Sequence, residues 1–334
     1  MPERRTTTLG ATAVTVTDLG FGGSAIGNLG RGVDDETARS AVAAAWAVGI
    51  RYFDTAPHYG LGLSERRLGQ ALAVRPRTEY TISTKVGRLL VPAGDRVGSD
   101  LEAGGFDVPA TTRRVFDFSR DGVRRSLEAS LSRLGLDRVD IALVHDPDTP
   151  LHAETALREA LPALGELRAE GVVGAVGLGM NSWTTPLRAV READVDVVMV
   201  AGCWTLLRPD AGELLDECAS RGVSVLAAAP FNSGLLASDQ PAVDGRFDYR
   251  PADRAIVEQA RRLARIGAGF GVRLPSAALQ FPFRHPAVAS VVVGLRTPVQ
   301  VASAAAGIDE PIRPEVWSAL LGAPASSEVG GHRR

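Results

Sequence analysis

Residues 139–178, VDIALVHDPDTPLHAETALREALPALGELRAEGVVGAVGL, contain one complete repeating unit of the fold. Apolar and β-branched residues dominate Val139–His145, which predicts a strand. An amphipathic run over 154–170 predicts a helix, and a second apolar run predicts another strand over 172–178. A strand, a helix and a strand in this order are typical of a βαβ unit with parallel strands.

The same alternation continues on both sides of this unit. Further strands are predicted at 20–22, 51–54, 80–84, 195–200, 223–228 and 289–293, and further helices at Asp35–Ala47, 64–73, 119–134, 211–221 and 251–268. Eight βα units predict an α/β fold, a (β/α)8 TIM barrel that forms a single domain over residues 1–323. We expect residues 324–334 to form a flexible C-terminal tail.

Two long segments interrupt the alternation. Residues 87–117 follow the third predicted strand, and residues 231–251 follow the seventh. Loops of this length are uncommon unless they are functional, and both would lie over the catalytic end of a barrel. A doubly wound sheet is the alternative fold, but the glycine-rich segment 20–24 lacks the G-x-G-x-x-G spacing of a dinucleotide-binding turn.

The composition argues against several classes of protein. The 37 basic and 39 acidic residues nearly balance, so no basic surplus indicates a nucleic-acid partner. No apolar run is long enough to span a membrane. The two cysteines, Cys203 and Cys218, fit neither a disulfide framework nor a zinc cluster, and no metal site is expected. We expect a cytoplasmic enzyme with a small-molecule partner, and a homo-oligomer stays possible.

Lys85 is the only lysine in the chain, and all the other basic residues are arginine. In one interpretation, a GC-rich coding sequence explains the arginine bias, and the presence of a single lysine at position 85 has no functional meaning. In the other, Lys85 does what arginine cannot, because a compact ammonium fits a small pocket and shifts its pKa.

The surroundings of Lys85 favour the second interpretation. Asp54, Lys85 and His145 stand at the ends of three successive predicted strands, and Tyr59 lies in the turn after the first. The carboxyl ends of barrel strands converge, so these four side chains are expected at one mouth. His145 and Asp146 are adjacent on a strand, so we expect their side chains to point apart.

Together these groups suit proton transfer to a carbonyl or from an alcohol. A tyrosine with a pKa of about 10 is a weak acid and base at neutral pH. A neighbouring ammonium is expected to lower that pKa, and an aspartate to keep the lysine charged and in place. A histidine on the opposite wall can hold the substrate oxygen.

The motifs around these residues resemble those of the aldo-keto reductase superfamily. The segments are FDTAPHYG at 53–60, SERRLG at 64–69, STKVG at 83–87 and DGVRRSLEASLSRLGLDRVD at 121–140. The resemblance extends from about residue 20 to 307. It implies a (β/α)8 barrel and NAD(P)-dependent hydride transfer, with a catalytic tetrad of Asp54, Tyr59, Lys85 and His145.

Within the superfamily, HDPD at 145–148 and VGRLL at 86–90 are most similar to a bacterial subgroup. That subgroup contains L-fucose (D-threo-aldose) 1-dehydrogenases, with pyridoxal 4-dehydrogenase close to it and plant L-galactose dehydrogenase more distant. The resemblance implies oxidation of the C1 hydroxyl of an aldose to the lactone, with Tyr59 as general acid/base. His58, Asp146 and Trp204 are candidates for contact with the substrate.

The cofactor site departs from the pattern of the better-known reductases. Only Asn181 remains of a Ser-Asn pair that binds the carboxamide. The tyrosine that stacks on the nicotinamide is absent, so either Phe231 or Trp204 replaces it or the ring is held differently. Gln300 takes the place of an arginine that often grips a 2′-phosphate, so both NAD and NADP stay open. The candidate cofactor-binding residues are Gly23, Asn181, Phe231, Asn232, Ser233, Gly234, Leu235, Gly294, Arg296, Thr297 and Gln300.

Other functions compete with aldose oxidation. The same tetrad serves an NADPH-dependent aldehyde reductase or a pyridoxal 4-dehydrogenase, with Tyr59 acting as an acid in the reductase. Lys85 also suits the Schiff-base chemistry of a class I aldolase, which is another barrel enzyme. Some members of the superfamily are cofactor-sensing regulatory subunits of a channel, although a complete tetrad argues against a lost activity.

Overall fold

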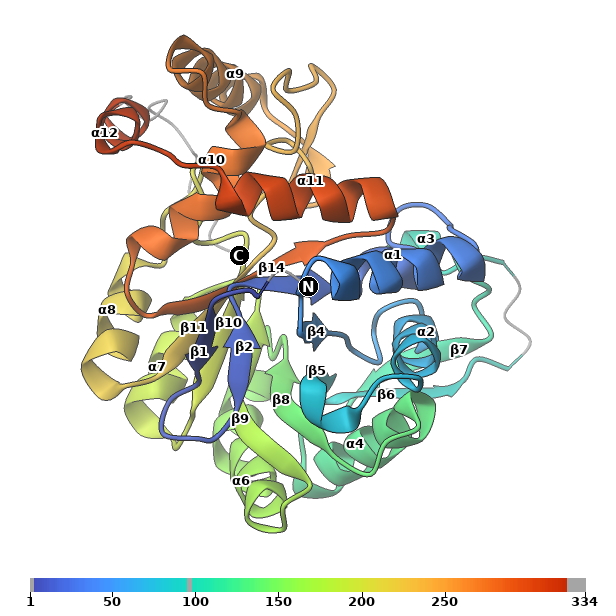
Figure 1. Ribbon diagram of the computed structural model, residues 1–334. Coiled ribbons are helices and arrows are strands. Elements are labelled where there is room, and N and C mark those ends of the chain that lie inside the picture. Colours follow the sequence, from blue (N-terminus) through green and yellow to red (C-terminus); the bar gives the residue numbers. More distant parts are fainter. Residues whose placement is uncertain (1–2, 95–97, 323–334) are drawn as a thin grey trace.

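A computed structural model describes residues 3–94 and 98–322. Eight of the described strands form a closed parallel barrel, in which β14 pairs with β3, so the predicted (β/α)8 fold is confirmed (Figure 1). The barrel strands are β3 (Leu19–Gly22), β4 (Tyr52–Asp54), β5 (Thr81–Val86), β8 (Val139–His145), β9 (Val173–Met180), β10 (Val197–Ala201), β11 (Ser224–Ala228) and β14 (Val288–Gly294). The tail expected at 324–334 lies outside the described residues.

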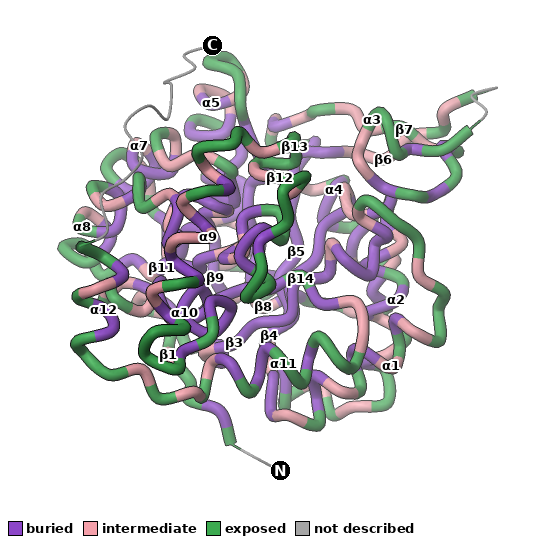
Figure 2. Tube along the Cα trace, turned by 90° about the horizontal axis from the view of Figure 1, so that it is seen from above, coloured by how far each residue is buried: buried purple, intermediate pink, exposed green. Residues whose placement is uncertain are grey.

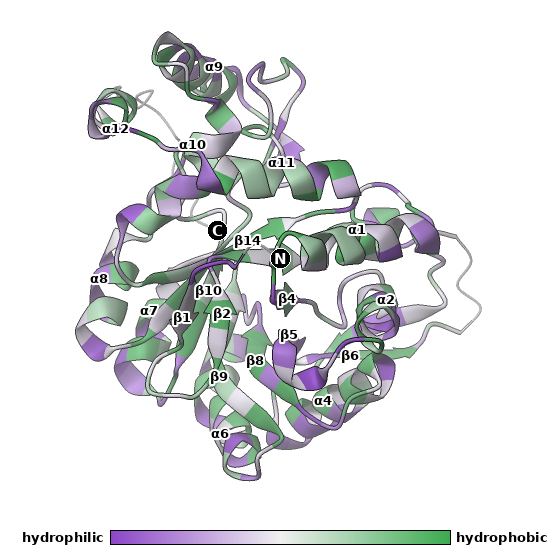
Figure 3. Cartoon of the chain, viewed as in Figure 1, coloured by the Kyte–Doolittle hydropathy of each residue, from purple (hydrophilic) through white to green (hydrophobic). Residues whose placement is uncertain are grey.

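Helices surround the barrel on its outer side (Figure 1). They are α1 (Asp35–Ala47), α2 (Leu63–Leu72), α4 (Arg120–Leu134), α5 (Pro150–Thr155), α6 (Leu161–Ala169), α7 (Thr184–Glu192), α8 (Gly212–Arg221), α9 (Arg254–Gly269), α10 (Leu274–Gln280), α11 (Pro298–Asp309) and α12 (Pro314–Leu321). The helix predicted over 154–170 is present but begins earlier, at Pro150, and a π-helical turn at Ala156–Ala160 joins α5 to α6. Figure 3 shows apolar residues along the strands and hydrophilic residues on the surrounding helices.

The two ends of the barrel differ. A hairpin of β1 (Thr6–Thr8) and β2 (Thr15–Thr17) covers the amino-terminal end, where Leu9 and Val16 pack on the interior residues Tyr52 and Ile141. Two further hairpins lie at the opposite end (Figure 2). They are β6 (Arg88–Pro92) with β7 (Thr112–Phe116), and β12 (Arg246–Phe247) with β13 (Arg250–Pro251).

These two hairpins lie within the two long segments that interrupt the predicted alternation of strands and helices. Residues 87–117 contain the β6–β7 hairpin and the short helix α3 (Leu101–Gly104), and residues 231–251 contain the β12–β13 hairpin. Both therefore hold their side chains on regular backbone at the carboxyl ends of the barrel strands, where active sites of this fold lie.

Candidate active site

The four predicted catalytic residues meet at the mouth of the barrel. Asp54 and His145 are the last residues of β4 and β8, and Lys85 lies near the end of β5. Lys85 is 2% exposed and its Nζ donates to both carboxylate oxygens of Asp54, each at 2.8 Å, and to the Thr55 carbonyl at 3.0 Å. The same Nζ lies 3.1 Å from Tyr59 Oη. The lysine therefore joins the aspartate to the tyrosine.

Asp54 has a second support that sequence reasoning missed. Ser83 Oγ donates to Asp54 Oδ1 at 2.7 Å, and the Tyr52 hydroxyl donates to Ser83 Oγ at 3.0 Å. All three residues are buried and lie on the adjacent strands β4 and β5. Side chains alternate along a strand, so Tyr52, Asp54, Ser83 and Lys85 all point into the barrel. This alternation is the sequence pattern from which the hydrogen-bonded series could have been predicted.

The turn that carries Tyr59 packs tightly on the loop after β3. Gly60 has a φ of +63°, and a Cβ atom there would lie 2.2 Å from the carbonyl oxygen of Gly27. The Ser64 hydroxyl, inside α2, donates to the Gly23 carbonyl at 2.8 Å and accepts from Thr55 Oγ1. Tyr59 is therefore held by buried hydrogen bonds and close backbone packing.

The pKa of Tyr59 moves against the expectation from sequence. Burial, and then the negative charge of Asp54, raise the pKa of Tyr59 well above its ordinary value. The Lys85 ammonium does not reverse this, because its hydrogens are shared among Asp54, Thr55 and Tyr59. Tyr59 is therefore a protonated phenol at neutral pH in this structure.

Two histidines face Tyr59 as neutral rings. The ring centroids of His145 and Tyr59 are 5.8 Å apart, and those of His58 and His145 are 5.6 Å apart. Burial, followed by the positive charge of Arg88, lowers the pKa of His58 to about 2 and that of His145 well below its ordinary value. The Nδ1 atoms of both rings are buried without a hydrogen-bond partner among the described residues.

Asp146 turns back toward His145, so the expectation that their side chains point apart is wrong. Its φ of +44° reverses the chain beyond β8 and brings Oδ2 to 3.4 Å from His145 Nε2. Its Oδ1 accepts from the backbone and side-chain amides of Asn181, both at 3.3 Å. Burial raises the pKa of Asp146 to about 6, and the positive charge of Arg88 opposes that rise.

The β6–β7 hairpin supplies two arginines to this site that sequence reasoning missed. Arg88 donates to Asp146 Oδ2 at 2.6 Å. Arg114 donates to the carbonyl oxygen of His58 at 2.9 Å and forms a two-fold ion pair with the buried carboxylate of Asp100. The position of Arg88, three residues beyond Lys85, is the one signal that the sequence offers.

The loops after β9 and β11 carry several of the predicted cofactor residues. Asn232 is buried, its Nδ2 lies 3.4 Å from the Gly202 carbonyl, and its Oδ1 has no partner among the described residues. An acceptor left open beside the strand ends fits the amide group of a nicotinamide. Ser233 and Gly234 follow with positive φ angles. Asn181, after β9, is exposed, and its backbone carbonyl accepts from the Cys203 thiol at 3.0 Å.

The loop after β14 holds the remaining candidates. Thr297 Oγ1 accepts from the Gln300 amide, and Gln300 Oε1 accepts from the Arg296 amide, so these residues cap α11 together. The Arg296 guanidinium donates to the carbonyls of Leu29 and Arg31, at 3.0 and 3.4 Å. Gly294 is exposed at the end of β14. This arrangement offers the amino end of α11 to a phosphate.

Some predicted residues lie apart from the cluster. Trp204 donates from its indole to the Pro282 carbonyl at 3.1 Å and packs on Phe281, so its ring contacts the outer helices. Leu235 is buried in a core cluster with α9 and α10, and Phe231 packs half-buried between two such clusters. Gly23 allows the loop after β3 to pack closely against α2, because a Cβ atom there would lie 2.5 Å from Ser64 Oγ.

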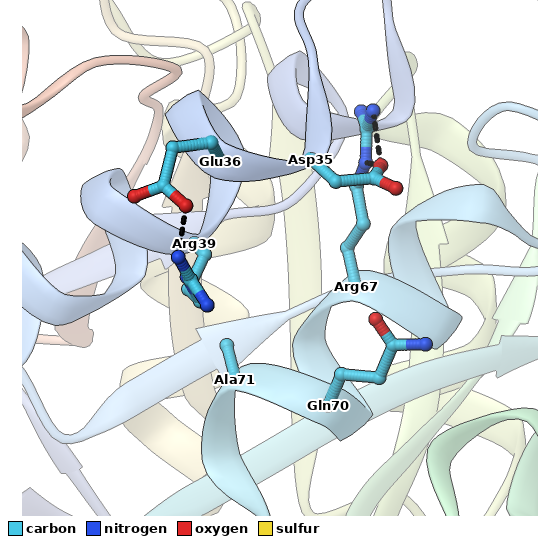
Figure 4. Close-up of a pocket in the computed structure, with 6 residues that line it drawn as sticks. All are labelled: Asp35, Glu36, Arg39, Arg67, Gln70 and Ala71. Atoms are coloured by element: carbon cyan, nitrogen blue, oxygen red, sulfur yellow. Dashed lines mark hydrogen bonds and ion pairs between the residues drawn. The ribbon is translucent and has the colours of Figure 1, made fainter.

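Other features of the described residues carry no site of their own. A cavity of about 290 Å³ lies between α1 and α2, lined by charged residues such as Asp35 and Arg67, outside the tetrad (Figure 4). Within 3–94 and 98–322, no three metal-ligating side chains gather closely enough to bind a metal ion. None of the helices described is both long and apolar enough to cross a membrane.

The sequence and the geometry agree with comparisons to known proteins. A model of the aldo/keto reductase family matches residues 18–323, and the chain belongs to this family. It is 45% identical to a D-threo-aldose 1-dehydrogenase from a Pseudomonas species, over 93% of this chain and 94% of that protein. It is 38% identical to a pyridoxal 4-dehydrogenase from Microbacterium luteolum, over 93% and 95% of the two chains.

A solved structure supports the fold. An aldo-keto reductase from Bacillus halodurans in its holo form superposes with a TM-score of 0.77 at 24% identity, covering 96% of each chain. The chain is therefore an oxidoreductase with the barrel of its family, whose members use a nicotinamide cofactor.

Proposed function

We propose that this protein oxidises the C1 hydroxyl of an aldose to the lactone with NAD or NADP. The observation that carries the proposal is the buried Asp54–Lys85–Tyr59 relay beside two neutral histidines. The identity of 45% with a D-threo-aldose 1-dehydrogenase favours sugars of the L-fucose, D-arabinose and L-galactose type as substrates.

The residues of the chain divide the work. Tyr59 Oη accepts the proton of the C1 hydroxyl, Lys85 Nζ donates to the phenolate that this transfer requires, and Asp54 holds Lys85 in position. His145, as a neutral ring, hydrogen-bonds the same substrate oxygen and orients it. A nicotinamide cofactor held beside the tetrad would supply the hydride-transfer chemistry at C1.

The cofactor would be held by the loops after β9, β11 and β14. Asn181 and the open Oδ1 of Asn232 suit the carboxamide, and the backbone amides of 231–235 suit the pyrophosphate. Arg296, Thr297 and the amino end of α11 suit the phosphate of the adenosine half. His58 and Asp146 are proposed to contact the other hydroxyls of the sugar.

A second candidate function is reduction of aldehydes by NADPH. It is favoured by the raised pKa of Tyr59, because a protonated phenol is ready to give a proton to a carbonyl oxygen. A Schiff-base role for Lys85 is disfavoured, because its Nζ is already in contact with the Asp54 carboxylate, the Thr55 carbonyl and Tyr59 Oη, where it has little room to attack a carbonyl carbon.

The test is absorbance of the reduced nicotinamide with purified protein, NAD or NADP, and a panel of L-fucose, D-arabinose, L-galactose, L-xylose and pyridoxal. We expect one set of aldoses to give a signal and the lactone as product. No change in absorbance with any aldose, together with consumption of NADPH when simple aldehydes are added, would assign the reductase function. A cytoplasmic location and a homo-oligomer stay predictions.

A further inference from the structure

The tip of the β12–β13 hairpin has an unusual backbone for its residues. Asp248 and Tyr249 have φ angles of +48° and +65°, and the strands on either side pair as Phe247 with Arg250. Two successive positive φ angles are the geometry of a two-residue hairpin turn whose second position favours glycine. A tyrosine there is strained, which suggests that its side chain serves a purpose that glycine cannot.

The hairpin is fastened to the loops around the candidate cofactor site. Arg208, in the loop after β10, donates to the carboxylate of Asp248 and to Cys203 Sγ, the latter at 3.2 Å. The Cys203 thiol in turn donates to the carbonyl of Asn181, whose amides bond to Asp146. This chain of contacts connects the tip of the hairpin to the carboxylate beside His145.

On the other side, the backbone amide of Tyr249 donates to Ser233 Oγ at 2.9 Å, in the loop after β11. The hairpin therefore lies at the same end of the barrel as the β6–β7 hairpin (Figure 2). Its tip is anchored both to the loop after β10 and to the loop after β11.

The hydroxyl of Tyr249 interacts electrostatically with charged residues of the candidate active site. Tyr249 as a whole residue is 54% exposed, while burial of its hydroxyl group, followed by the negative charge of Asp146, raises the pKa of Tyr249. The Lys85 ammonium acts on the same hydroxyl, and Tyr249 contributes to the raised pKa of Tyr59. The hydrogen bond of the Tyr249 amide to Ser233 and the ion pair of Asp248 with Arg208 hold the tip of the hairpin at the carboxyl end of the barrel, where His145 and Tyr59 lie (Figure 2).

We propose that Tyr249 determines specificity for pyranose sugars by packing its ring on the C–H face of the substrate, with the Arg208–Asp248 ion pair holding it in place. This role rests on the proposed aldose oxidation. Two other side chains near the mouth, His58 and Asp146, are polar and suit hydroxyl groups. The ring carbons of a pyranose need an apolar partner, and an aromatic ring supplies one.

The test compares Tyr249→Gly and Tyr249→Phe with the wild-type enzyme, using L-fucose and the better of NAD and NADP. We expect Tyr249→Gly to raise KM for the sugar about tenfold with kcat within about twofold, because only the stacking contact is lost. Tyr249→Phe should keep the wild-type KM. Since glycine suits the turn, the melting temperature of Tyr249→Gly should be unchanged or higher.

Controls separate this role from two others. Phe270→Gly removes an exposed ring at the end of α9 and should leave KM unchanged. Asp248→Ala breaks the ion pair to Arg208 and should raise KM for the sugar less than Tyr249→Gly does. The Kd of the reduced cofactor, from quenching of protein fluorescence, should be the same in all these variants.

Three outcomes would overturn the proposal. A sugar KM unchanged in Tyr249→Gly, in an enzyme that oxidises aldoses, would remove the role of Tyr249 and leave the proposed function intact. A weaker cofactor Kd with an unchanged sugar KM would assign the hairpin to the cofactor. Absence of aldose oxidation by the wild-type enzyme would overturn the proposed function and this inference together.

Discussion

The two sides of the barrel mouth are built in different ways. In the relay on β4 and β5, buried side chains satisfy one another: both oxygens of Asp54 accept from Lys85, and Ser83 adds a third hydrogen bond. On the side of β9, β10, β11 and β14, the acceptor Oδ1 of Asn232 has no partner among the described residues. Positive φ angles occur there at Ala229 and Asn232.

The difference indicates how each side works. The first side is organised by a few buried side chains before a ligand arrives, so one substitution should disable it. The second side offers backbone groups and loops to a long cofactor, so its binding energy is spread over many contacts. Substitutions on the first side should therefore change kcat strongly, and those on the second should change cofactor binding slightly.

Tyr59→Phe should lower kcat for aldose oxidation about a thousandfold, because it removes the group that accepts the proton. Steady-state assays and a cofactor titration measure both effects, and the Kd of the cofactor should stay within about twofold. Tyr80→Phe is the matched control, since Tyr80 packs against Trp46 and Phe53 outside the barrel. Wild-type turnover in Tyr59→Phe would make the mechanism wrong.

Lys85→Arg should lower kcat about a hundredfold, although the charge is kept. The Nζ atom is within 3.1 Å of Asp54, Thr55 and Tyr59, and a planar guanidinium cannot take up that position. Single-turnover assays with saturating cofactor measure the effect on the chemical step. A variant within about fivefold of the wild-type rate would show that a small ammonium is not needed.

Oxidation of the sugar should become faster as pH rises, because the deprotonated form of Tyr59 accepts the proton. Burial and Asp54 raise the pKa of Tyr59, so below that pKa each pH unit should increase kcat/KM about tenfold. Reduction of an aldehyde needs the protonated phenol and should stay flat over the same range. A flat profile for oxidation between neutral and alkaline pH would contradict the role of Tyr59 as the base.

Asn232→Gly should raise KM for the cofactor only about fivefold, with kcat within about twofold. Glycine accepts the φ of +45° at this position, so the variant tests the amide side chain and not the backbone. Initial rates at varied NAD and NADP provide the measurement. A loss of turnover as large as that of Tyr59→Phe would remove the distinction between the two sides.

The positions of the residues on the first side can be predicted from the sequence. Asp54, Lys85 and His145 were found because strand ends in a barrel converge, and the structure brings them to Tyr59. The (β/α)8 fold follows from the repeated βα pattern in the same way. The direction of the pKa shift of Tyr59 was wrong, because a sequence shows neighbouring charges but not the extent of burial.

The opposite side was predicted poorly, and the reasons are physical. Trp204 turns to the outer helices and Leu235 joins a core cluster, which depends on loop conformation rather than on residue type. Asp146 approaches His145 because its φ angle is positive, and the residues around it in the sequence do not predict that angle. Tyr249 lies on a hairpin with only two residues in each strand, too short to give a periodic signal.

One isotopic measurement addresses hydride transfer from C1 itself. The wild-type enzyme would be supplied with L-fucose carrying deuterium at C1 and with the cofactor that gives the faster reaction, and both products analysed by mass spectrometry. Oxidation at C1 predicts deuterium in the reduced nicotinamide and none in the lactone. Deuterium that stays in the sugar product, or a reduced cofactor without the label, would contradict aldose C1 oxidation.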